Sequence, residues 1–184
     1  EISACLVGSE MCIRDSSQNN ALQNGLHANV YESLVYYNSK TFDVEPVLAT
    51  AWKEISPTQV RFTLRQGVKF HDGSPLTTDD AVYSIQRAMA KTSNFTPYVQ
   101  GISKVVKVDA QNFDVILSSP NPVLLRQMTE LRIMSKAWAE KNKSVEPKDI
   151  KGTDENFAHR NAMGTGPYTP VSYTHLRAHE TGRN

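Results

Sequence analysis

The two ends of this chain encode each other on opposite strands of DNA, and this limits how much of it can fold as one protein. Val171–Thr181 (VSYTHLRAHET) can be back-translated into DNA with allowed codons. The reverse complement of that DNA, translated from its third base, gives LVGSEMCIRD. That string is Leu6–Asp15, residue for residue. So long a match leaves little room for coincidence, and both ends require a common explanation in DNA.

The DNA implied by these ends resembles the mosaic end and flanking primer of transposase-based sequencing adapters. We therefore expect residues 1–16 and 170–184 to be translated adapter. Like a tag or a fusion scar, these residues are not expected to belong to the fold. The remaining stretch, residues 17–169, is about 150 residues long. That length is enough for one domain core.

The composition excludes several classes of site. Both cysteines, Cys5 and Cys12, lie in the first adapter-like end, so the remaining stretch offers no disulfide and no thiolate metal site. The whole chain carries 20 basic and 19 acidic residues, and the basic ones are not concentrated as nucleic-acid binding requires. No apolar run approaches the ~18 residues of a membrane span. We expect no nucleic-acid partner and no metal.

Hydrophobic periodicity predicts strands and helices interspersed along the chain, which defines an α/β class. Val60, Phe62 and Leu64 alternate with polar residues in the period-two pattern of a half-buried strand. Turn residues separate the predicted strands, which cover residues 47–55, 59–64, 68–70, 102–108 and 113–117. The last two, on either side of residues 109–112, are predicted to form a hairpin.

Helices are predicted between these strands. The clearest one begins at Thr77 or Thr78, because a hydroxyl cap and the early carboxylates of Asp79 and Asp80 satisfy free amide groups. Its apolar stripe faces a core and consists of Ala81, Val82, Ile85, Ala88 and Met89. The other predicted helices cover residues 29–37, 121–129 and 136–143, and residues 143–160 are a predicted connector.

Four sequence blocks together resemble one family. They are VYESLV (residues 30–35), PVLATAWK (46–53), FTLRQGVKFHDGSPLTTDDAVYSI (62–85) and GTGPY (164–168). They are similar to the extracellular solute-binding proteins of ABC importers, in the family that serves peptides, dipeptides and nickel. The resemblance implies a partial periplasmic-binding-protein-like fold of the two-lobed type II. Residues 17–169 would be the N-terminal part of the solute-binding domain, with the first lobe and its inserted subdomain only.

The resemblance also implies a function. Such a protein captures oligopeptides or dipeptides without covalent chemistry, closes two lobes around them by a hinge motion, and delivers them to an ABC permease with its ATPase subunits. It would be a monomer when complete, without a cofactor, in the periplasm or outside the cell, with or without a lipid anchor. The same scaffold also fits a nickel-chelate, haem or glutathione binder. A further alternative is the ligand-sensing domain of a transcriptional regulator, with a helix-turn-helix upstream of residue 17.

Candidate ligand contacts follow from the resemblance. In the peptide-binding relatives, an acidic residue of the helix that matches VYESL reaches the cleft, which points to Glu32 with Tyr31 beside it. A carboxylate can pair with a ligand ammonium, and a tyrosine offers a ring and a hydroxyl. The alternative is that Glu32 is an exposed helix residue and that Tyr31 beside it packs in the core. Tyr98, in the stretch SNFTPY, matches a segment that contributes a tyrosine in some relatives.

The GTGPY block supplies the remaining candidates, Gly164, Thr165 and Gly166. Its two glycines allow the backbone to approach something closely, and that neighbour is either another strand or the ligand. The resemblance places this block beside the cleft.

The sequence offers no catalytic site. His71 and Asp72 with two nearby acids could suggest a metal site, but Asp72-Gly73 makes a turn and the other acids suit a helix start. Ser33 and Ser74 lack the small-residue elbow of an activated serine. We therefore expect a binding protein and not an enzyme.

Overall fold

The computed structural model describes residues 28–147, 157–159 and 161–169. Both adapter-like ends and most of the predicted connector lie outside these described residues, so the adapter assignment stays a prediction. The strands are β1 (Val35–Tyr37), β2 (Val44–Pro46), β3 (Ala49–Ser56), β4 (Gln59–Leu64), β5 (Ile102–Lys107) and β6 (Asn112–Leu117). The helices are α2 (Thr78–Ala88), α3 (Thr96–Val99), α4 (Leu124–Met128) and α5 (Lys136–Lys141), with a 3-10 turn η1 (Phe157–His159).

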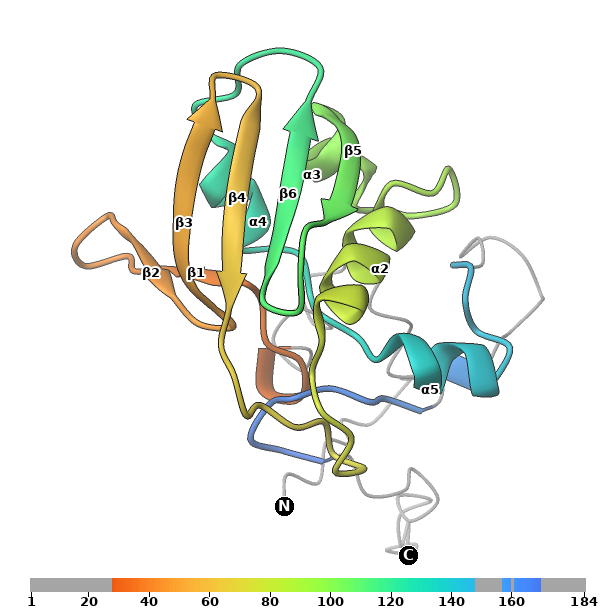
Figure 1. Ribbon diagram of the computed structural model, residues 1–184. Helices are drawn as coiled ribbons and strands as arrows, with labels where there is room; N and C mark the ends of the chain where they lie inside the picture. The colour runs from red at the N-terminus through yellow and green to blue at the C-terminus, as the bar shows by residue number, and fades with distance from the viewer. Residues whose placement is uncertain (1–27, 148–156, 160, 170–184) are drawn as a thin grey trace, which may run out of the picture.

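A four-stranded antiparallel sheet, in the order β3-β4-β6-β5, forms one layer of the molecule (Figure 1). The predicted hairpin of β5 and β6 is confirmed. The predicted alternation in β4 is also confirmed, because Phe62 and Leu64 are buried while Arg61 and Thr63 are only partly buried. Phe62 stands opposite Phe113 of β6, and the two rings stack with their centroids 5.5 Å apart.

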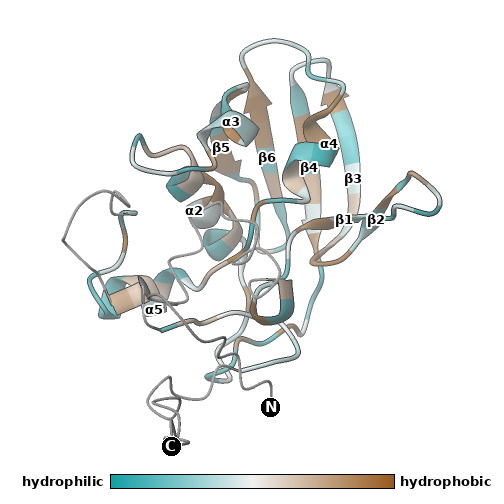
Figure 2. Cartoon of the chain, turned by 180° about the vertical axis from the view of Figure 1, so that it is seen from behind, coloured by the Kyte–Doolittle hydropathy of each residue, from teal (hydrophilic) through white to brown (hydrophobic). Residues whose placement is uncertain are grey.

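Helices α2, α3 and α4 lie on one face of this sheet (Figures 1 and 2). Apolar side chains from both layers form a single core there, which includes Leu64, Ile85 and Val115. The opposite face is polar, and on it Arg61 of β4 donates to Asp114 of β6 from Nε at 2.7 Å and Nη2 at 2.9 Å. Helices therefore cover one face of the sheet, and on the other face the ion pair between Arg61 and Asp114 connects β4 to β6.

Helix α2 begins as predicted, with Thr77 as its N-cap. The carboxylate of Asp80 accepts hydrogen bonds from the Thr77 amide at 2.9 Å and from the Lys136 amide at 2.8 Å. One buried carboxylate therefore connects the start of α2 to the start of α5. The predicted stripe faces the core and comprises buried Ala81, Ile85 and Ala88 with half-buried Val82 and Met89.

The helix predicted over residues 29–37 is wrong after its first turn. Only residues 28–30 are helical, and Val35–Tyr37 forms β1, which pairs with β2 in a two-stranded sheet. The apolar spacing suits a helix, but β-branched and aromatic residues favour a strand where a pairing partner is present. The strand predicted at residues 68–70 is also wrong, because only an isolated bridge between Lys69 and Pro75 forms there.

The other two predicted helices are present but shorter than expected. The helix predicted over residues 121–129 is α4, which covers only Leu124–Met128, and the one over residues 136–143 is α5, which ends at Lys141. Helix ends are set by local capping contacts, and these are the least predictable part of an element.

Candidate functional site

Three chain segments that are far apart in the sequence meet through backbone hydrogen bonds, and we call their meeting the crossing: residues 29–33, 131–134 and 164–168. Gly166 N donates to Val30 O at 2.9 Å. On the other side, Ile133 N donates to Glu32 O at 2.9 Å. The segment that carries Tyr31 and Glu32 is thereby fixed between the two others.

The glycines of the crossing stand where a side chain would not fit. A Cβ atom on Gly166 would lie 2.6 Å from the carbonyl oxygen of Asn29. On Gly164 it would overlap the carbonyl oxygen of Val30 and lie 2.9 Å from Cδ1 of Tyr31. Neither glycine has a positive φ, so the requirement is space and not backbone conformation. The sequence left open whether the close neighbour of these two glycines is another strand or the ligand. In the structure the neighbour is the backbone of residues 29–30.

His71 holds the GTGPY segment from a further side. Its amide donates to Gly164 O at 3.1 Å, its Nδ1 accepts from Gly164 N at 3.4 Å, and its Nε2 lies 2.9 Å from Gly166 O. Both ring contacts are satisfied by the neutral tautomer with the proton on Nε2, because Nδ1 must accept. These contacts give His71 a structural role, as expected from the sequence, where a turn was preferred to a metal site.

Asp72, the next residue, makes the predicted turn. Its carboxylate accepts from Ser74 Oγ at 2.6 Å and from Ser74 N at 2.9 Å. These hydrogen bonds, led by the one from the Ser74 hydroxyl, lower the pKa of the Asp72 carboxyl below its ordinary value. The Ser33 hydroxyl donates to Val35 O at 2.8 Å. Both serines therefore make local structural hydrogen bonds.

Tyr31 and Glu32 have different surroundings. The ring of Tyr31 is 1% exposed and packs in a small core with Tyr83 and Met134. Glu32 is partly exposed, and its carboxylate makes no hydrogen bond or ion pair within the described part of the chain. Tyr31 thus supports the crossing from the core, whereas the Glu32 carboxylate has capacity for a further partner. Their contact with a ligand stays a prediction.

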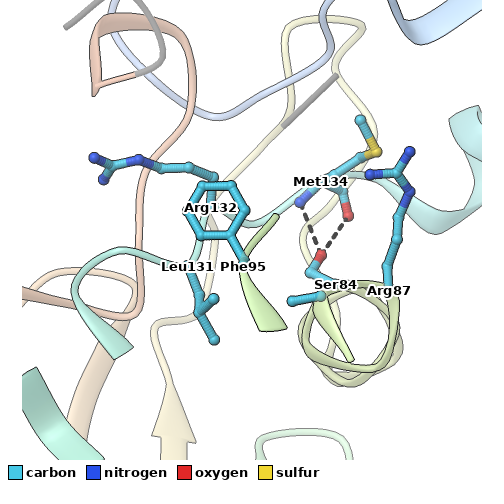
Figure 3. A pocket seen from close by; sticks show the side chains of 7 residues that line it. Ser84, Arg87, Phe95, Leu131, Arg132 and Met134 are labelled. Carbon is cyan, nitrogen blue, oxygen red and sulfur yellow. Dashed lines mark hydrogen bonds between the residues drawn. The ribbon is translucent and has the colours of Figure 1, made fainter. Parts of the chain in front are cut away.

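Thr165 and Tyr98 occupy two further positions. Thr165 lies between the two glycines of the crossing, and its buried Oγ1 has no hydrogen-bond partner among the described residues. Tyr98 belongs to α3, outside the crossing, with its ring centroid 5.9 Å from that of Phe95. Phe95 in turn lines a narrow pocket with Arg132 (Figure 3). Phe95 therefore lies next to both Tyr98 and the 131–134 segment.

Arg132 is a candidate that sequence reasoning missed. It stands opposite Ser33 in an isolated antiparallel bridge and is half-buried. Burial lowers the pKa of its guanidinium, an effect that attraction to Glu130 only partly offsets. The only sequence signal was a basic residue inside the otherwise apolar run LRIM.

Among the residues that the structure describes, no group of three or more His, Cys, Asp or Glu side chains converges as metal ligands would. Nor does that part of the chain contain a helix with the length and apolar character of a membrane span.

The fold is that of the periplasmic binding proteins, of which the chain forms a part. The oligopeptide-binding protein AppA from Bacillus subtilis, solved with a nonapeptide, matches with a TM-score of 0.76 and 19% identity, over 93% of this chain and 34% of that one. AgaA from A. tumefacien R10, in complex with agropinic acid, matches with a TM-score of 0.74 and 22% identity, over 91% and 32%. At these identities the likeness shows the fold.

The family follows from the sequence match. Residues 43–181 match the family described as bacterial extracellular solute-binding proteins, family 5 Middle. The chain belongs to the bacterial extracellular solute-binding proteins, family 5, which confirms the resemblance of the four blocks. The last matched residues, 170–181, fall in the end that the adapter prediction sets aside.

The chain is also similar to part of a curated transcriptional regulator. The HTH-type transcriptional regulator SgrR of Escherichia coli (strain K12) is 31% identical over 145 residues, which are 77% of this chain and 23% of the regulator. The chain therefore spans about a quarter of this relative and about a third of the two solved structures.

Proposed function

We propose that the complete protein is the substrate-capture component of a bacterial ABC importer, which binds peptides between two lobes and delivers them to the permease and its ATPase subunits. The observation that carries this proposal is the family match over residues 43–181 on a fold shared with solute-binding structures. The complete protein would act as a monomer in the periplasm or outside the cell.

The crossing would form one wall of the binding cleft. Its backbone hydrogen bonds hold residues 29–33, and His71 holds Gly164 and Gly166, before a ligand arrives, so little conformational freedom is lost on binding. The Glu32 carboxylate would pair with a ligand ammonium, and an extended peptide would add backbone hydrogen bonds as an added strand does. Hinge closure of the second lobe would then cover the ligand.

The remaining predicted contacts take secondary parts in this proposal. Tyr31 would act from the core by holding the segment that carries Glu32. Gly164, Thr165 and Gly166 would line the wall through their backbone, with the buried Thr165 hydroxyl close behind it. Tyr98 would reach the ligand only from α3, beyond Phe95.

A ligand-sensing domain of a transcriptional regulator is the second candidate, and the match to SgrR favours it. The two candidates share the lobe and differ in what precedes it in the gene. A transporter component has a secretory leader, whereas a regulator has a DNA-binding domain.

Long-read sequencing of the source locus, outward from codons 17–169, distinguishes the two. The proposal predicts a leader peptide upstream, several hundred further codons downstream, and neither adapter-like end in the genome. A helix-turn-helix upstream would contradict the transporter in favour of the regulator. A gene that encodes both ends and stops after residue 184 would contradict the adapter prediction and the two-lobed protein together.

A further inference from the structure

A pocket outside the crossing lies at the end of the sheet where β3 turns into β4. This turn is at the top of Figure 1, whereas the segment of residues 161–169, drawn in blue, lies below the sheet. The volume of the pocket is about 360 Å³, within the range of roughly 300–1,000 Å³ that small-molecule sites occupy. Its apolar walls include Val60 of β4, Leu117 of β6 and Leu124 of α4. The pocket is therefore large enough for a small ligand and separate from the proposed solute cleft.

Glu54, which also lines the pocket, has an unusual position in the sheet. It is paired with Val60 between β3 and β4, as Trp52 is paired with the buried Phe62. Paired residues, and alternate residues of one strand, project from the same face, so Glu54 and Trp52 lie on the face that the helices cover. Elsewhere this face packs against the core, and the ion pair between β4 and β6 is on the opposite face. A carboxylate therefore stands on the apolar face of the sheet.

The described part of the chain supplies no cation for this carboxylate. Glu54 is exposed and makes no hydrogen bond or ion pair within the described residues, and it is the only charged residue among those that line the pocket. The neighbouring Lys53 is paired with Arg61 on the opposite face. The single cation of α4, Arg126, instead lies over the ring of Tyr37, with Cζ 5.2 Å from its centroid. The pocket is thus apolar with one negative charge at its mouth.

Trp52 adds a second feature that suits a positive charge. Its side chain is half-buried and packs against the main core, and it lines the pocket beside Glu54. The face of an indole attracts ammonium groups more strongly than the ring of any other side chain. A carboxylate and an indole on one wall of an apolar pocket are complementary to a cation with an apolar body.

The loop that closes the pocket is rigid before any ligand arrives. The Asn121 amide donates to Gln127 Oε1 at 2.8 Å and accepts from Val123 N at 3.1 Å. Pro120 and Pro122, on either side of Asn121, also line the pocket, and the ring of each proline fixes its φ. Little conformational freedom is therefore lost when the pocket is filled.

We propose that this pocket is a second ligand site, which binds an organic cation with an ammonium group on an apolar body. The ammonium lies between the carboxylate of Glu54 and the indole of Trp52, and the apolar body contacts Leu117 and Leu124. A neutral molecule of the same shape binds more weakly, and a carboxylate is repelled. This inference goes beyond the proposed function, because the pocket lies outside the crossing and does not depend on peptide capture.

Nuclear magnetic resonance of the full-length protein labelled with ¹⁵N tests the site locally. The indole N–H signal of Trp52 is assigned from its loss in Trp52→Phe, and it reports on this pocket and not on the solute cleft. The probes share one shape and differ in charge: 2-phenylethylamine, 2-phenylethanol and 3-phenylpropionate. The amine should shift the signal with millimolar affinity, and the alcohol should bind about 5- to 10-fold more weakly. The carboxylate should bind more weakly than the alcohol.

A matched pair of variants tests the charge of Glu54. Glu54→Gln keeps the shape of an exposed side chain, so it should lower the affinity for the amine to that for the alcohol and leave the alcohol unchanged. The control is Glu140→Gln, which neutralises an exposed carboxylate on α5, outside the pocket. This variant should keep the preference for the amine.

Three results would overturn the proposal: equal affinities for the amine and the alcohol, an unchanged preference in Glu54→Gln, or no response of the Trp52 signal to the amine. The last result would mean that another part of the full-length chain covers the pocket. A Trp52 signal that moves with protein concentration before any probe is added would show that a second copy occupies the pocket, and would also overturn the proposal.

A failure of the proposed function would look different. In that case no dipeptide of the form X-Phe would bind the full-length protein, while the Trp52 signal would still respond to 2-phenylethylamine and Glu54→Gln would still remove the preference. Peptide capture would then be contradicted and the cation site supported.

Discussion

At the scale of single residues, the crossing depends on close packing that leaves no space for a side chain. Gly166→Ala would place a methyl group against the carbonyl oxygen of Asn29, so we expect it to lower the free energy of unfolding by about 1–3 kcal/mol. Urea unfolding of the full-length protein measures this change. Gly101→Ala is the control, because its Cβ would meet only the side-chain nitrogen of Asn121, at 3.4 Å. Equal effects of the two substitutions would contradict this account of the crossing.

The sequence could predict some of these single-residue features but not others. GTGPY indicated that a backbone approaches closely, because glycines have no side chain to keep a neighbour away. It could not show that the neighbour is the backbone of residues 29–30, which is a tertiary contact. Arg132 was missed for the same reason, since its surroundings depend on which residue the facing segment places opposite it.

At the scale of elements, buried polar side chains connect one helix or strand to another. Asp80 takes part in both the cap of α2 and the start of α5, so Asp80→Ala should cost about 1–3 kcal/mol of unfolding free energy. The neighbouring Asp79 forms an exposed ion pair with Lys107, and Asp79→Ala should cost less than about 1 kcal/mol. Thermal unfolding of both variants measures the difference. Similar losses would show that Asp80 does not connect the two helices.

The ion pair between β4 and β6 makes stability depend on pH. Hydrogen bonds from Arg61, and then from Gln59, lower the pKa of the Asp114 carboxyl in the folded protein. The folded state therefore binds fewer protons, and this contribution is present above the unfolded pKa of about 3.9 and lost as pH falls through the lower folded pKa. Asp114→Asn should be less stable than the wild type at pH 7, and the gap should narrow below about pH 4. Chemical unfolding at several pH values tests this, and a constant gap would contradict it.

An element can be predicted from the sequence when its own residues determine its conformation, and not when a contact with a distant segment does. Strand β4 and helix α2 carry their own periodic patterns and caps, and both were predicted. Strand β1 has only three residues inside a stretch of helical spacing, and its conformation is decided by pairing with β2. The pattern of the β1 residues alone does not show that they pair with β2.

At the scale of the whole molecule, the chain forms part of the fold of the periplasmic binding proteins. The four blocks together were enough to predict the family and the partial fold, and the most specific of them, residues 62–85, combines a strand, a turn with a fixed motif and a capped helix. The chain spans about a third of the solved structures that it matches. The closure around a solute that we propose therefore has to be measured on the complete protein.

Small-angle X-ray scattering of the full-length protein, with and without a saturating mixture of free X-Phe dipeptides, tests solute capture between two lobes most directly. We predict a smaller radius of gyration with the dipeptides, because hinge closure brings the second lobe onto the crossing. A radius of gyration that stays the same with every dipeptide would contradict capture of peptides by closure.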